Sequence, residues 1–131
     1  MIGILVTSHG DYCHSLIKSG EMIAGKQENV VGIALEEDGI ETFSQKLTET
    51  LNDMVDRFDS VLILCDLKGG TPCNESLKYV LYNESKIKII PGVNLPMYLE
   101  VVSSTGFVKD IHELATIGHN AGIQSIEVLD I

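Results

Sequence analysis

Basic residues are scarce in this sequence, and Arg57 is its only arginine. Lysine and arginine together number 9 against 19 aspartates and glutamates, so the formal net charge is −10. A surface of this charge repels nucleic-acid phosphates and anionic lipid head groups. We therefore expect no nucleic-acid binding and no direct adsorption to membranes, whereas a protein partner with a basic surface would be attracted.

Long apolar runs are missing as well. No stretch approaches the roughly 20 uninterrupted apolar residues that a membrane-spanning helix needs. The first residues, MIGILV, are typical of a strand, with no basic region before them and no small-residue cleavage site after them. We therefore expect a cytoplasmic protein without a secretion signal.

Paired cysteine spacings and carboxylate clusters suited to a metal are absent too. Cys13, Cys65 and Cys73 form an odd set beside apolar runs, which favours reduced, buried thiols over disulfides. A catalytic role for Cys65 or Cys73 stays open. The acidic run at 36–38 is interpreted as a solvated loop, so we expect neither a metal site nor a cofactor.

What the sequence does contain is a regular alternation of strand-like and helix-like segments. Its 131 residues, 44% of them hydrophobic, suit one globular domain, 1–131, and no linker or repeat interrupts it. This alternation predicts an α/β fold with an open, mostly parallel, doubly wound sheet and helices on both faces. The periodicity predicts strands at 3–6, Val30–Leu35, 61–65 and 86–90, and helices at Tyr12–Ala24, 38–58, 71–81, 94–102 and 109–121.

The starts of two expected helices and the final segment of the chain have characteristic residue patterns. Asp38 and Glu41 resemble a capping box, and Thr71 followed by Pro72 is predicted to be the N-cap and the first residue of a helix. The final segment, residues 125–131, alternates apolar and polar side chains. We expect it to form a half-exposed strand at an edge of the sheet.

The residues that follow each strand are the candidates for chemistry, because doubly wound sheets bind ligands beyond the carboxyl ends of their strands. His9 follows the first expected strand and Asp66 the third. If these strands are neighbours, the carboxylate of Asp66 can hold one ring nitrogen of His9 and leave the other as a nucleophile. Both residues are therefore predicted to be catalytic.

Three small residues, Gly69, Gly70 and Thr71, lie between Asp66 and the next helix. Backbone N–H groups, a hydroxyl and the positive end of a helix dipole make such a segment suited to phosphate, and we predict that these three residues bind it. A histidine, a carboxylate and an anion site at one edge of the sheet favour phosphoryl transfer through a phosphohistidine.

Three other functions can be weighed against this one. A receiver domain of the response-regulator type needs an acidic pair where this sequence has Ser8 and His9. A serine hydrolase would need these two side chains to face each other, whereas neighbours on a strand point to opposite faces. A phosphate- or nucleotide-binding module without turnover stays open. The remaining histidines are expected on helix surfaces: His14, His112 and His119.

Four segments spread along the whole chain match those of a known protein family, in the same order and with the same spacing: ILVTSHG, GEMIAGKQENV, LILCDLKGGTPCN and PGVNLPMYLE. They resemble the IIA domain of the mannose family of the bacterial sugar phosphotransferase system. The resemblance implies that His9 accepts a phosphoryl group from the phosphocarrier HPr and donates it to a IIB partner, which phosphorylates a sugar during uptake. It also implies that Asp66 orients His9 and that Thr71 places its hydroxyl near the phosphate.

The same resemblance implies a homodimer in which the last strand takes part in subunit exchange, and an indirect association with the membrane IIC and IID permease.

Two positions beside the site depart from the family pattern. Lys68 stands where an aromatic or apolar residue is usual, and Cys73 where phenylalanine is common. Both bear on partner recognition more than on chemistry. Related domains that phosphorylate dihydroxyacetone, or that control transcriptional regulators, are the alternative roles.

Overall fold

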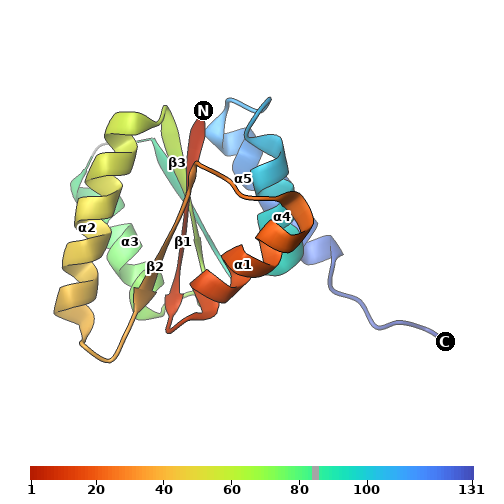
Figure 1. Ribbon diagram of the computed structural model, residues 1–131, viewed down its shortest axis with the longest axis horizontal. Helices are drawn as coiled ribbons and strands as arrows, with labels where there is room; N and C mark the ends of the chain where they lie inside the picture. Colours follow the sequence, from red (N-terminus) through yellow and green to blue (C-terminus); the bar gives the residue numbers. More distant parts are fainter. Residues whose placement is uncertain (84–85) are drawn as a thin grey trace.

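Four parallel strands form the centre of the molecule (Figure 1), in a computed structural model that describes residues 1–83 and 86–131. The strand order is β2-β1-β3-β4, so β1 has β2 on one side and β3 on the other. The order therefore reverses between β1 and β3. The expected open, parallel, doubly wound sheet is confirmed. Its strands are β1 (Ile2–His9), β2 (Val30–Leu35), β3 (Ser60–Cys65) and β4 (Ile87–Pro91).

Helices cover both faces of this sheet, as expected (Figure 1). One face is covered by α2 (Ile40–Arg57) and α3 (Thr71–Tyr82). The other face is covered by α1 (Tyr12–Ala24), α4 (Leu95–Ser104) and α5 (Ile111–Gln124). Over the described ranges, none of the helices is both long and apolar enough to cross a membrane.

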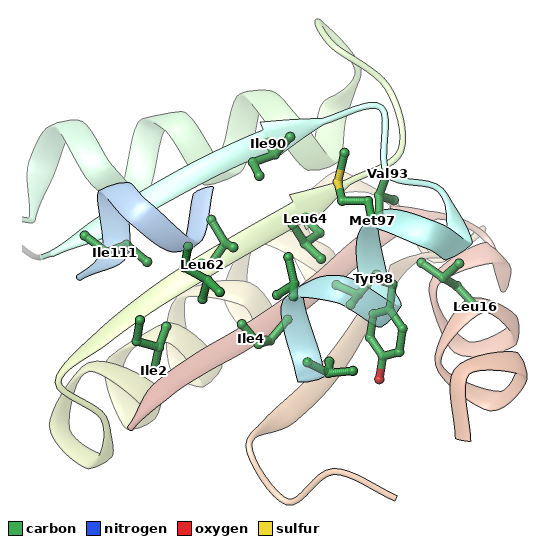
Figure 2. Packing of buried hydrophobic residues seen from close by; sticks show 14 of the residues in the cluster. Ile2, Ile4, Leu16, Leu62, Leu64, Ile90, Val93, Met97, Tyr98 and Ile111 are labelled. Carbon is green, nitrogen blue, oxygen red and sulfur yellow. The ribbon is translucent and has the colours of Figure 1, made fainter. Parts of the chain in front are cut away.

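The strands are apolar on both faces because each face packs against helices. Ile4 and Val6 of β1 pack toward α1, α4 and α5, whereas Leu5 packs toward α2 and α3. Figure 2 shows the first of these clusters, with Tyr98 of α4 among the strand side chains. A Cβ added to Gly20 of α1 would overlap the Tyr98 ring, so only glycine allows these two helices to approach so closely. This packing fixes α1 and α4 against the face of the sheet that contains Ile4 and Val6.

Two helix starts differ from the prediction. Helix α2 begins at Ile40 with Gly39 in the cap position and without a side-chain cap, so the predicted capping box at Asp38 is wrong. Gly39 has a φ of 101°, a conformation that lets the chain turn between Asp38 and the helix. Helix α3 has Gly70 in the cap position, so Thr71 is its first residue instead of its cap.

The last segment of the chain forms no strand within this chain, contrary to the prediction. Helix α5 runs to Gln124, and the residues beyond it extend away from the body of the protein (Figure 1). An alternating pattern becomes a strand only where a neighbouring strand accepts its backbone hydrogen bonds, and no strand of the described residues lies beside this segment. Its apolar side chains are therefore exposed: Ile126, Val128, Leu129 and Ile131.

Candidate functional site

His9 is the last residue of β1, and polar groups hold the turn that follows it. The hydroxyl of Ser8 accepts a hydrogen bond from the Cys13 N–H at 2.7 Å and donates one to the Gly10 carbonyl at 3.0 Å. Gly10 has a φ of 57°, which glycine adopts without strain. Ser8 is thus buried inside the turn, whereas the side chain of His9 is 46% exposed.

Asp66 holds His9 through one carboxylate oxygen. Its Oδ2 accepts a hydrogen bond from His9 Nδ1 at 2.8 Å and another from the His9 backbone N–H at 3.0 Å. Strands β1 and β3 are paired up to Thr7 and Cys65, so the sheet itself brings these two residues together. Because a carboxylate only accepts hydrogen bonds, we assign the ring proton to Nδ1, which leaves a lone pair on Nε2.

The second carboxylate oxygen of Asp66, Oδ1, is buried and has no hydrogen-bond partner within residues 1–83 and 86–131. The Asp66 side chain is only 14% exposed, so water screens its charge less than it would at an open surface. The charge is therefore well placed to stabilise positive charge that develops on the His9 ring during a reaction.

The glycine loop between β3 and α3 lies against the imidazole. A Cβ added to Gly70 would lie 2.7 Å from His9 Cε1 and 3.3 Å from His9 Nε2. The Gly70 N–H donates to the Leu67 carbonyl at 3.1 Å, and Gly69 has a φ of 82° in the same loop. Because Gly70 has no side chain, it leaves room for the His9 ring. The Gly70 N–H is already hydrogen-bonded within the loop.

Helix α3 begins beside this ring, because Thr71 directly follows Gly70. The first N–H groups of a helix lack intrahelical acceptors, and its N-terminus carries partial positive charge. Thr71 is partly buried at this start. A half-exposed histidine with a free Nε2 lone pair beside a helix N-terminus is suited to nucleophilic attack on an anionic group. The binding of phosphate by the loop and Thr71 stays a prediction.

The family model that matches this chain is described as "PTS system fructose IIA component", and the match covers residues 3–117. The chain belongs to this family of sugar phosphotransferase system IIA components. Such components are phosphotransferase relay proteins. The resemblance found in the sequence is therefore confirmed.

Named relatives of this IIA chain agree with the family match. The fructose-specific EIIA component of Bacillus subtilis is 34% identical over 104 residues, 79% of this chain and 70% of that protein. The mannose-specific EIIAB component of Escherichia coli is 31% identical over 129 residues, 98% of this chain but only 39% of that longer protein. The crystal structure of EIIA from Streptococcus agalactiae has a TM-score of 0.87 and 32% identity, covering 98% of this chain and 97% of that one.

The cysteines of the IIA chain are buried. Burial, and to a lesser degree the neighbouring Cys73, raises the pKa of the Cys65 thiol, which keeps it protonated and a poor nucleophile. This agrees with the reduced, buried thiols that the sequence favours, and it argues against a catalytic role for Cys65. Over the described residues, no three His, Cys, Asp or Glu side chains form a group that could hold a metal ion. The remaining histidines are exposed on helices, as expected: His14, His112 and His119.

Two residues contact the turn or the ring of His9 in ways that the sequence does not predict. The sequence offers Ser8 as a hydrolase nucleophile or at the acidic-pair position of a receiver domain, whereas its hydroxyl holds the turn after His9. A serine just before a glycine turn and a helix is the pattern that points to such a role. Gly70 was considered only as a phosphate ligand, and no sequence pattern shows that it packs against His9.

Proposed function

We propose that this chain relays phosphoryl groups in sugar uptake. In this proposal His9 accepts a phosphoryl group from the phosphocarrier HPr and passes it to a IIB partner, which phosphorylates the sugar. The observation that carries the proposal is the hydrogen bond from His9 Nδ1 to Asp66 at the reversal of strand order, which leaves the lone pair of Nε2 free on a half-exposed side chain. The relatives are named for fructose and for mannose, so no particular sugar is proposed.

The proposed reaction exchanges one bond to phosphorus for another. The Nε2 lone pair of His9 forms a bond to phosphorus while the bond from phosphorus to HPr breaks, and HPr keeps that electron pair. The Nδ1 proton remains in its hydrogen bond to Asp66, whose negative charge balances the positive charge of the phosphorylated ring. In the second step the same phosphoryl group leaves Nε2 for a nucleophile of the IIB partner.

The start of α3 would stabilise the phosphoryl oxygens during both steps. Its N-terminus is beside His9, and the hydroxyl of Thr71 and the backbone of Gly69 are the groups that would contact the phosphate. These contacts lower the charge repulsion that an anionic phosphoryl group meets near Asp66.

The proposed partners are HPr and a IIB component, with an indirect link to the membrane IIC and IID permease, and the proposed location is the cytoplasm. The E. coli relative is named EIIAB, which supports IIB as the next carrier. A net charge of −10 favours fast, transient encounters with partners that present basic surfaces.

Incubation with phosphorylated HPr tests this proposal. The chain should gain one phosphoryl group that is labile in acid and stable in alkali, as a phosphorus–nitrogen bond requires, and peptide mapping should place it on His9. An unlabelled chain, or an acid-stable phosphate on Ser8 or Thr71, would contradict the proposal.

Replacing Gly70 by alanine is expected to displace the imidazole without straining the backbone. Gly70 has a φ of −78° and a ψ of 164°, which any residue adopts, so the new methyl group affects only its neighbours. Because the ring of His9 must shift from the position in which it bonds to Asp66, phosphoryl transfer from HPr should slow by about 10–10²-fold in a rapid-mixing assay.

Gly106→Ala is the matched control, because a Cβ at Gly106 would meet nothing within 4 Å. This variant should react at the rate of the unmodified chain. Equal rates in the Gly70 variant and the unmodified chain would show that the added methyl group does not displace the imidazole. Gly70 would then have no role in positioning His9.

We further propose that two copies of the chain pair through their C-terminal segments. Residues 126–131 expose four large apolar side chains in the single chain, and unpaired apolar segments of this kind are prone to association. Pairing with a second copy in a two-fold arrangement would bury them. The exchange of this segment between subunits is part of the same proposal.

Removal of residues 126–131 should therefore convert a dimer into a monomer. The removed residues are exposed, so the rest of the fold should persist, with an unchanged far-ultraviolet circular dichroism spectrum. Light scattering at micromolar concentration measures the molar mass of both forms. A full-length monomer, or a truncated chain that remains dimeric, would refute this mode of assembly.

A further inference from the structure

A second candidate site lies at the opposite end of the sheet from His9. The amino ends of β3 and β4 and the start of α5 line a cavity of about 520 Å³. Ser60, in its wall, pairs with Ile2 at the far end of β1. At about 3.3 Å per residue along a strand, the cavity is about 20 Å or more from His9. It is therefore separate from the proposed phosphoryl site.

This cavity concentrates positive charge on an acidic protein. Lys86, Lys88 and Lys109 line it, three of only 9 basic residues in the chain. None of the three forms an ion pair with the residues that the structure describes. Charges more than about 10 Å away are largely screened at physiological salt, so a small ligand here would respond to these lysines more than to the net charge of −10.

The two carboxylates in the same wall already have partners. Asp59 forms an ion pair with the N-terminal amine, and Asp110 accepts a hydrogen bond from the His112 N–H at the start of α5. The hydrogen bond and charge of that amine, together with Lys109 and Lys86, hold the pKa of Asp59 below its usual value. The wall is thus positive overall, but it also offers carboxylate oxygens as hydrogen-bond acceptors.

A buried hydroxyl in the wall lacks a partner. Ser60 is only 5% exposed, and its Oγ makes no hydrogen bond with residues 1–83 or 86–131. An unsatisfied buried hydroxyl is unfavourable, and such groups in folded proteins call for an explanation. Ser60 lines the cavity, but its Oγ is covered in the unliganded chain, so its side chain has to turn toward the cavity before a bound anion supplies the missing acceptor.

We propose that this cavity binds a small phosphate monoester that carries hydroxyl groups, such as a monosaccharide phosphate. The three lysines and the Ser60 hydroxyl hold the phosphate group, and the carboxylates of Asp59 and Asp110 accept hydrogen bonds from the ligand hydroxyls. A volume of about 520 Å³ lies within the range of small-molecule sites, whereas a long polyanion would meet the acidic remainder of the surface.

Titration of the full-length chain with glucose 6-phosphate, glucose and inorganic phosphate tests this assignment. Backbone amide resonances from Ser60, Lys88 and His112 should shift in a saturable way with glucose 6-phosphate, and the sugar phosphate should bind more tightly than the other two compounds. Lys88→Gln and Ser60→Ala should each weaken binding by about tenfold, the effect of losing one hydrogen bond to a charged group.

Lys78→Gln is the matched control, because it removes the same charge from α3 outside the cavity. It should leave the affinity unchanged, and Lys88→Gln should leave phosphoryl transfer from HPr unchanged, so this proposal and the relay role can fail separately. Absence of saturable binding, equal loss in both lysine variants, or equal affinity for inorganic phosphate would overturn the assignment. Binding that appears only after removal of residues 126–131 would also overturn it. Such a result would mean that, in the full-length protein, the C-terminal segment of a second copy occupies the cavity.

Discussion

A His9→Gln variant should accept no phosphoryl group from HPr. Glutamine keeps a polar side chain at the end of β1 but has no nitrogen lone pair that can bond to phosphorus. The His9 side chain is 46% exposed, so its replacement should change the free energy of unfolding by about 1 kcal/mol or less. Loss of labelling with a nearly unchanged melting temperature is therefore expected.

His119→Gln is the matched control for this variant, because His119 is exposed on α5, away from the site. It should be labelled as fully as the unmodified chain, with phosphate measured by mass spectrometry under alkaline conditions. Full labelling of His9→Gln would mean that another side chain accepts the phosphoryl group, which would contradict the proposed role of His9.

Asp66→Asn should slow phosphoryl transfer by about 10²–10⁴-fold, the range typical of orienting and acid–base groups. The amide oxygen can still accept hydrogen bonds from His9, but the negative charge that balances the phosphorylated ring is lost. An amide NH₂ turned toward Nδ1 would also favour the tautomer in which Nε2 carries the proton and cannot attack. Single-turnover labelling with phosphorylated HPr measures the rate.

Two further variants separate this effect from general charge and from phosphate contacts. Asp56→Asn removes the same charge from the exposed side of α2 and should leave the rate unchanged. Thr71→Ala should slow transfer less than Asp66→Asn, because the helix N-terminus remains. If Asp66→Asn reacted at the unmodified rate, the hydrogen bond to His9 would have no part in the chemistry.

The contact between His9 and Asp66 was predictable because two strong regularities coincide. Apolar runs without alternation mark strands covered on both faces, and parallel sheets place functional groups after the carboxyl ends of their strands. His9 and Asp66 occupy those positions, so the sequence alone brought them to one edge of the sheet. The family resemblance was readable for a similar reason, since the residues of the site lie in short, continuous segments.

The start of helix α2 and the conformation of the C-terminal segment were less predictable. The capping box at Asp38 failed because Gly39 adopts a positive φ and shifts the start of α2, and a single sequence does not show which of two adjacent residues will turn the chain. The alternation of residues 125–131 was real, but a strand needs a neighbour, and the alternating pattern carries no information on whether that neighbour belongs to the same chain.

The sequence by itself determined the parallel sheet, the placement of His9 and Asp66 at the carboxyl ends of two of its strands, and the acidic surface, because these depend on periodicity and composition. Only the tertiary structure decided that both hydrogen bonds of His9 fall on one oxygen of Asp66 and that Gly70 packs against the ring. It also gathered Ser60 and three distant lysines around one cavity. Such contacts depend on ångström-scale packing of helices on the sheet, which joins residues far apart along the chain.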